Sequence, residues 1–140
     1  MKIVRTLSVT RNEFLDYLER GLLARYREAS DDATSVGPIA PGLRFSLGAG
    51  VELRVDEFDR KHGVVATRVT SPGDTHLAWY TVKDDDRGVT VVFEQRMRAF
   101  EEGRCNRLLR GFSEAVYLGR MAESLLDAEE KIIAMRTGAV

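Results

Sequence analysis

The sequence predicts an α+β fold, in which an antiparallel β-sheet of about six strands wraps around a long C-terminal helix in the order β-α-β-β-β-β-β-α. Three observations predict it: a capped helix follows one short strand, alternating apolar and polar residues fill the middle of the chain, and one continuous apolar arc spans residues 104–135. The chain has 140 residues, of which 44% are apolar and 31% charged. This size and balance indicate a single domain, residues 1–140.

Residues 2–9 form the first predicted strand, because Ile3, Leu7 and Val9 alternate with polar residues at a period of two. Arg5 interrupts this pattern, since it shares a face with Ile3 and Leu7. An arginine on an apolar face must pair, reach solvent or contact something polar. Arg5 is therefore the first candidate site residue.

The first helix is predicted to begin after Thr10 and to end near Ala29. Thr10 is a suitable N-cap, and Glu13, three residues later, completes a capping box. Apolar residues then recur at spacings of three and four and form a buried stripe: Phe14, Leu15, Leu18, Leu22 and Tyr26. Prolines and glycines in residues 30–42 predict a loop.

Five further strands are predicted between this loop and the last helix. The predicted turns between them include residues 60–63, residues 71–74 and an acidic hairpin tip at residues 84–86. Strands joined by such short turns must be antiparallel, because a parallel pair needs a long crossover.

Residues 104–135 predict one long helix with two apolar stripes. The first stripe comprises Leu108, Phe112, Ala115, Gly119, Ala122 and Leu126, and the second comprises Leu118, Met121, Leu125 and Ile132. So wide an apolar arc indicates a deeply buried helix. The open face of the sheet and this arc can cover each other, which is the helix-grip arrangement.

Three segments resemble a bacterial family of unknown function within the START-like superfamily, which includes relatives of the birch-pollen allergen. They are residues 2–7 (KIVRTL), residues 41–43 (PGL) and residues 106–121, which begin NRLLRGFSEA and end YLGRM. The resemblance implies a helix-grip fold with a cavity between the sheet and the long helix. Members of the superfamily bind lipids, hormones or polyketides, and a minority are enzymes, so the resemblance names no activity for this chain.

Seven residues are candidates for the wall of this cavity: Arg5, Glu57, His76, Tyr80, Phe93, Gln95 and Phe112. Strand alternation puts His76 on the same face as Tyr80, and the hairpin pairing places it near Gln95. By the same alternation Glu57 shares a face with Val55. Arg5 and Glu57 either orient a polar group of a ligand or form an ordinary salt bridge at the end of the sheet.

Three functions follow as hypotheses. The first is a protein that binds a small, partly apolar or amphipathic ligand between the sheet and the C-terminal helix. The second is a non-catalytic homodimeric module with a filled cavity, whose outer sheet face, near Leu77 and Trp79 with Val65 and Val69, forms the subunit contact. The third is a cyclase- or hydrolase-like enzyme that uses His76, Tyr80 or Glu57 as acid or base.

Composition excludes several other classes. The net charge is −1 and the basic residues are dispersed, which argues against a nucleic-acid binder. No apolar run reaches the length of a membrane span, and the N-terminus lacks a signal-peptide core. The lone Cys105 permits no intrachain disulfide, and two dispersed histidines make no metal site. We therefore expect a cytoplasmic protein without metal or cofactor, and the sequence assigns no catalytic residue.

Overall fold

The computed structural model describes residues 1–30, 39–97, 107–136 and 138, without the side chains of residues 30 and 107–117. It confirms the predicted α+β class and element order. The elements are β1 (Lys2–Leu7), α1 (Arg11–Ser30), β2 (Arg44–Gly48), β3 (Val51–Asp59), β4 (Val64–Ser71), β5 (Asp74–Asp85), β6 (Gly88–Met97) and α3 (Arg107–Arg136). The six strands form one antiparallel sheet in the order β1-β6-β5-β4-β3-β2.

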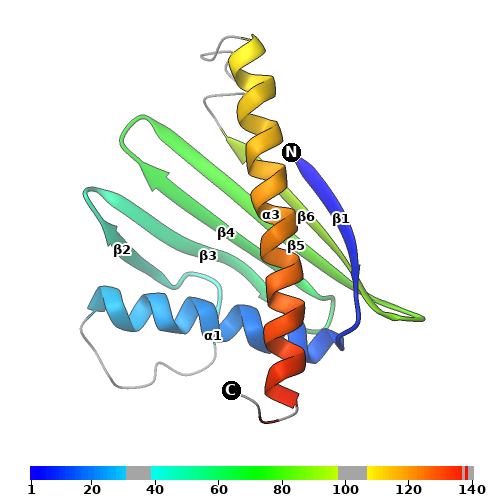
Figure 1. Ribbon diagram of the computed structural model, residues 1–140. Helices are drawn as coiled ribbons and strands as arrows, with labels where there is room; N and C mark the ends of the chain where they lie inside the picture. Colours follow the sequence, from blue (N-terminus) through cyan, green and yellow to red (C-terminus); the bar gives the residue numbers. More distant parts are fainter. Residues whose placement is uncertain (31–38, 98–106, 137, 139–140) are drawn as a thin grey trace.

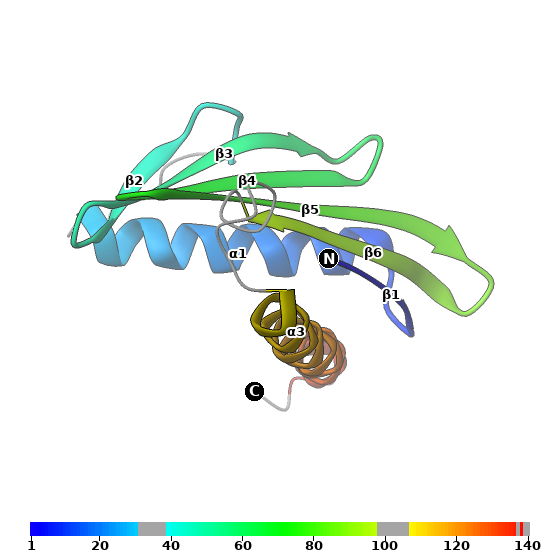
Figure 2. The ribbon, with the colours of Figure 1, turned by 90° about the horizontal axis from the view of Figure 1, so that it is seen from above.

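Both helices lie on the same side of the sheet (Figures 1 and 2). The helix α1 crosses beneath the strands, and α3 runs past it so that the C-terminal half of α3 meets the N-terminal half of α1. This inner face of the sheet is therefore covered by two helices that cross. Neither described helix is long and apolar enough to cross a membrane.

The start of α1 has the predicted capping box. The Thr10 backbone N–H donates to Glu13 Oε1 at 2.9 Å, and the Glu13 backbone N–H donates to Thr10 Oγ1 at 3.1 Å. Val9 and Phe14, one residue before the cap and four after it, are both 1% exposed and belong to the same core cluster. The short segment from Val9 to Phe14 therefore fixes the angle at which the chain leaves β1 and enters α1.

Two apolar clusters lie along α1. The larger joins the N-terminal part of α1 to β1, β5, β6 and α3, and its buried members include Leu7, Leu15 and Val91. The smaller lies under the C-terminal part of α1 and is built on Phe45 and Leu53. Because the two clusters sit at different ends of α1, the middle of that helix is left between them, and the candidate site lies there.

The ends of α1 and α3 are joined by charged side chains. The Arg136 Nε donates to Glu13 Oε2 at 2.6 Å, and Arg136 also donates to the Ser8 carbonyl oxygen at 3.1 Å. Two turns earlier in α3, Glu129 Oε2 accepts from the Ser8 backbone N–H at 2.6 Å. These contacts hold the C-terminal end of α3 against the junction of β1 and α1.

Candidate functional site

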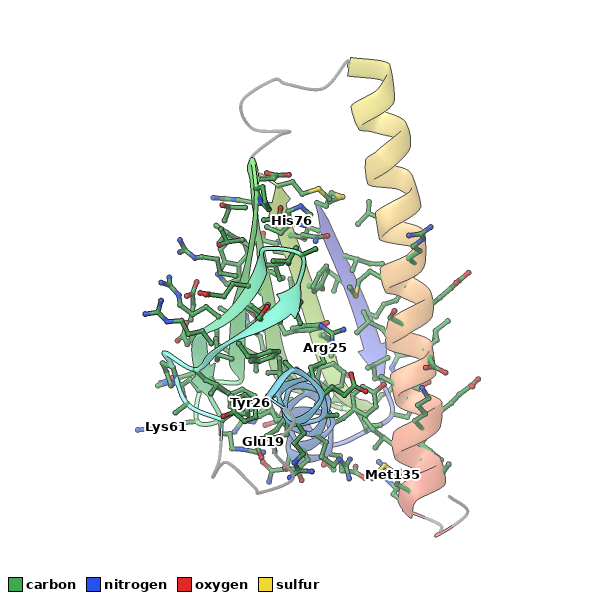
Figure 3. The ribbon with its side chains drawn as sticks, turned by 90° about the vertical axis from the view of Figure 1, so that its left-hand side faces the viewer. Glu19, Arg25, Tyr26, Lys61, His76 and Met135 are labelled. Carbon is green, nitrogen blue, oxygen red and sulfur yellow. The ribbon has the colours of Figure 1, made fainter. Side chains whose placement is uncertain are left out.

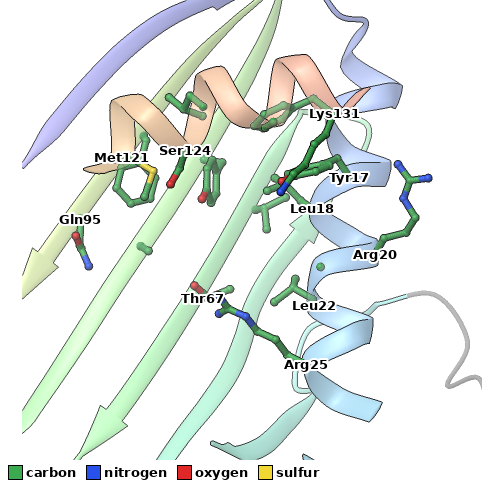
Figure 4. A pocket seen from close by; sticks show the side chains of 18 of the residues that line it. Tyr17, Leu18, Arg20, Leu22, Arg25, Thr67, Gln95, Met121, Ser124 and Lys131 are labelled. Carbon is green, nitrogen blue, oxygen red and sulfur yellow. The ribbon is translucent and has the colours of Figure 1, made fainter. Parts of the chain in front are cut away.

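A pocket of about 920 Å³ opens between α1, the inner face of the sheet and α3 (Figure 4). Its apolar lining consists of Phe14, Leu18, Gly21, Leu22, Leu53, Val65, Val69, Ala78, Phe93, Met121, Leu125, Ala128 and Met135. Its polar lining consists of Tyr17, Arg20, Arg25, Thr67, Tyr80, Gln95, Ser124 and Lys131. The pocket is thus an apolar concavity with a few polar groups, the usual composition of a small-molecule site.

The helix α1 forms one wall through a single face. Phe14, Leu18, Gly21 and Arg25 recur at spacings of four, three and four, which places them in line along the helix. An added Cβ at Gly21 would meet no atom within 4 Å, so this position leaves open space beside the pocket. Along α1 the wall is therefore aromatic at Phe14, has open space at Gly21 and is cationic at Arg25.

Aromatic rings form part of the sheet wall. The ring centroids of Tyr80 and Phe93, on paired strands, are 5.0 Å apart, and the Tyr80 ring is 6.1 Å from that of Phe14 on α1. Burial raises the pKa of the Tyr80 hydroxyl above its ordinary value of 10.0, against the opposing effect of the Arg25 charge. The hydroxyl therefore stays protonated at neutral pH and can donate a hydrogen bond.

Three of the predicted residues line this pocket. Tyr80, Phe93 and Gln95 all point to the inner face, as strand alternation predicted. Gln95 is paired with Ala78, which is the next pair on the same face, two residues from the Tyr80–Phe93 pair. The β5–β6 hairpin therefore contributes Gln95 and both aromatic side chains of the sheet wall.

The predicted pairing of His76 with Gln95 is wrong, because the register of the two strands differs from the prediction by two residues. His76 is opposite Met97 in the register of β5 and β6, because the hairpin turn is tighter than the acidic tip suggested. The His76 Nε2 lies 3.3 Å from Asp74 Oδ2, and His76 is not among the residues that line the pocket. Figure 3 shows it at the end of the sheet farthest from α1.

The face predicted for Glu57 is also wrong. The register of β3 and β4 shifts between Val55 and Glu57, so that Val55 is opposite Thr67 but Glu57 is opposite Ala66. Such a β-bulge inserts one extra residue and reverses the alternation beyond it. Glu57 consequently points to the outer face and is exposed.

Arg5 and Phe112 do not contribute a described side chain to the pocket. Arg5 keeps the predicted face, opposite Val91, but its side chain is exposed and its Nη1 donates to the neighbouring Val4 carbonyl oxygen at 2.8 Å. It is not a lining residue. Phe112 belongs to α3, but its side chain lies outside the described residues, as does Cys105.

Sequence reasoning missed the polar residues that the two helices contribute: Tyr17, Arg20, Arg25, Ser124 and Lys131. A signal for one of them was present, because Gly21 and Arg25 continue the apolar stripe of α1 at helical spacing. A glycine and an arginine in such a stripe indicate a place where the helix face meets no core. No signal indicated Lys131, since its position depends on the crossing of α3 and α1.

The outer sheet face differs from the predicted apolar patch. Leu77 and Trp79 are half-buried on that face, and the Arg96 guanidinium lies 5.7 Å from the centre of the Trp79 ring. Val65 and Val69 are opposite Tyr80 and His76 and point inward instead. The outer patch is therefore smaller than predicted, and a homodimer through it stays a prediction.

Within the described part of the chain, no group of three or more histidine, cysteine, aspartate or glutamate side chains is arranged to hold a metal ion. His62 lies in the turn after β3, where its Nδ1 is 2.6 Å from Asp59 Oδ2. Both described histidines thus lie beside one nearby aspartate each, and neither is a lining residue of the pocket.

No family model matches the chain, and no curated protein is significantly similar to it in sequence. The narrower resemblance to one bacterial family therefore stays a prediction. Solved structures, in contrast, are similar over nearly the whole chain.

Ara h 8.0201 has a TM-score of 0.64 at 8% identity, over 96% of this chain and 97% of that one. A protein of unknown function from Staphylococcus aureus has a TM-score of 0.61 at 12% identity, over 99% and 94% of the two chains. A norcoclaurine synthase from Thalictrum flavum, solved with a transition-state analogue, has a TM-score of 0.58 at 8% identity, over 97% and 94%. These likenesses establish that the chain has the helix-grip fold.

Proposed function

We propose that this protein binds a small, partly apolar ligand in the pocket between the sheet, α1 and α3. The observation that carries the proposal is the pocket itself. Its volume of about 920 Å³ lies at the upper end of the range of about 300 to 1,000 Å³ for small-molecule sites, and most of its lining is apolar. The norcoclaurine synthase adds that a protein of this fold accommodates a small molecule.

Incomplete core packing along the middle of α1 supports a ligand rather than a filled interior. Leu18 and Leu22 face the inner side of the sheet and are only half-buried, whereas Leu15 in the adjoining cluster is fully buried. Apolar side chains left partly exposed in a concavity gain free energy when an apolar ligand covers them, at about 25 cal/mol for each Å² removed from water.

The test uses Nile red, a neutral dye that fluoresces in apolar sites, and the Ala78→Phe variant. Ala78 lines the pocket on β5, so a phenyl ring there fills space that a ligand would occupy. Ala24→Phe is the matched control, because Ala24 is exposed on α1 and does not line the pocket. We expect Ala78→Phe to weaken dye binding about tenfold or more and Ala24→Phe to leave it unchanged.

Native mass spectrometry of the freshly purified protein complements the dye. A reproducible extra mass that Ala24→Phe retains and Ala78→Phe loses supports the proposal and gives the class of the ligand. Dye binding that is the same in all three proteins, all of them folded by circular dichroism, contradicts it. The same spectra give the oligomeric state and so test the predicted homodimer.

The enzyme hypothesis has weaker support. Of its three acid–base candidates, only Tyr80 lines the pocket, while His76 and Glu57 lie elsewhere. A protonated phenol with a raised pKa acts as a hydrogen-bond donor at neutral pH and not as a base. Binding without turnover is therefore the function that the described residues support best.

A further inference from the structure

The charged residues of the pocket are all of one sign. Arg20, Arg25 and Lys131 line it, and none of its described lining residues is an aspartate or a glutamate. The chain as a whole has a net charge of −1, so this excess does not reflect its overall composition. A pocket with cations and no carboxylate of its own favours a ligand that brings a negative charge.

The three cations differ in what they already contact. The Lys131 Nζ lies 2.9 Å from Asp127 Oδ2, so Lys131 already has a carboxylate partner on its own helix. Figure 4 shows the Arg20 side chain directed away from the strands. Arg25 forms no ion pair with any described residue, and two acids of the same helix, Asp16 and Glu19, both bind Arg60.

Arg25 is also the cation that faces the interior of the pocket. Figures 3 and 4 show its side chain extending from α1 toward the inner face of the sheet, in the direction of Thr67 on β4. Its guanidinium is near enough to influence the ionisation of the Tyr80 hydroxyl, which stays protonated. A cation and two hydroxyl groups thus border the same space, and all three can donate hydrogen bonds.

We propose that the pocket binds an amphipathic monoanion, an apolar body with one carboxylate, and that Arg25 binds the carboxylate. This inference rests on the proposed function. Arg25 is exposed at the rim, so the carboxylate would stay partly hydrated there while the apolar body lies against residues such as Leu18, Val65 and Phe93. The planar guanidinium matches a carboxylate with two parallel hydrogen bonds, which a neutral head group cannot accept equally well.

The test compares three molecules with the same apolar chain: dodecanoate, 1-dodecanol and dodecylamine. Each displaces Nile red from the wild-type protein at pH 7.4, below its micellar concentration. We expect dodecanoate to bind about fivefold more tightly than 1-dodecanol, the ratio expected of a partly exposed charge pair, and dodecylamine to bind most weakly. Added salt should reduce the preference for the acid, because the charges are near solvent.

The Arg25→Gln variant identifies the residue responsible. It should bind dodecanoate and 1-dodecanol about equally while still binding the alcohol as the wild type does. Arg27→Gln is the matched control, because Arg27 is an exposed arginine of the same helix that does not line the pocket. This control should keep the full preference, since it removes the same charge from outside the site.

A second pair, 2-naphthoate and 2-naphthol, separates an aliphatic from an aromatic body. An acid preference in either pair supports the inference and shows which body the pocket accepts. Equal binding of acid and neutral partner in both pairs, or a preference that Arg25→Gln retains, overturns it and leaves the proposed function intact. If neither Nile red nor any of these molecules binds, the proposed function itself fails.

Discussion

The Glu13→Gln substitution removes the ion pair that joins the start of α1 to the end of α3. In the wild type the Arg136 guanidinium lies 2.6 and 2.7 Å from the two carboxylate oxygens of Glu13. Glutamine keeps an oxygen that can accept from the Thr10 N–H, so the capping box is retained and the charge alone is lost. The effect of the substitution therefore measures the contact between the helices.

Its magnitude follows from the pKa of Glu13. The hydrogen bond from Arg136, opposed by burial and assisted by Thr10, lowers that pKa from 4.5 to about 2. At about 1.36 kcal/mol per pKa unit this difference sets an upper limit of about 3 kcal/mol. The side chains are 27% and 43% exposed, and solvent screening reduces the expected loss on substitution to about 1 kcal/mol.

The pH dependence of this contribution has a defined sign. A carboxyl group whose pKa is lower in the folded state stabilises the fold fully above its unfolded pKa, about 4.5, and loses this effect as the pH falls toward about 2. Urea unfolding of both proteins should therefore differ by a constant amount from pH 7 to pH 5. The difference should then shrink as the pH falls from 4.5 to 2.

Glu28→Gln serves as the control, because Glu28 is an exposed acid of the same helix with no described ion pair. It should leave the unfolding free energy nearly unchanged at every pH. A difference between wild type and Glu13→Gln that persists undiminished at pH 2.5 would refute the reasoning, as would an equal loss in the Glu28→Gln control.

Three further substitutions test the fold around the site. Gly63→Ala should lower the free energy of unfolding by more than about 1 kcal/mol in thermal melts, because the residue has a φ of +69° and its Cβ would clash with the Val82 carbonyl oxygen. The control Gly73→Ala should cost less, because Gly73 has a similar φ of +85° but no atom lies within 4 Å of the added Cβ. Leu15→Ala should cost about 2–5 kcal/mol in urea, because Leu15 is fully buried, and a smaller loss would show that the core collapses around the gap. Asp56→Asn should lower the free energy of unfolding modestly, and by more at low salt. Burial raises the pKa of Asp56, but hydrogen bonds from Arg54 and Arg68 outweigh this effect and lower the pKa, so the carboxylate is stabilised in the folded state. A loss that does not depend on salt would contradict this explanation.

Local patterns in the sequence determined the elements and their order. The capping box at Thr10 and Glu13 and the period-two strands rely on interactions between residues close in the chain, which is why they could be predicted. The same alternation correctly placed Tyr80, Phe93 and Gln95 on the inner face of the sheet. Every second residue of a strand points to the same face, so the face of one residue in this hairpin predicts the faces of its neighbours.

Only the tertiary structure decided where alternation fails and which helix residues meet the sheet. The bulge between Val55 and Glu57 depends on the pairing of β3 with β4, and one extra residue there moved Glu57 to the outer face. The exact hairpin register placed His76 opposite Met97 instead of Gln95 and left its face unchanged. Lys131 borders the same pocket as Arg25 because α1 and α3 cross over the sheet, and this crossing of distant segments leaves no periodic trace in α3.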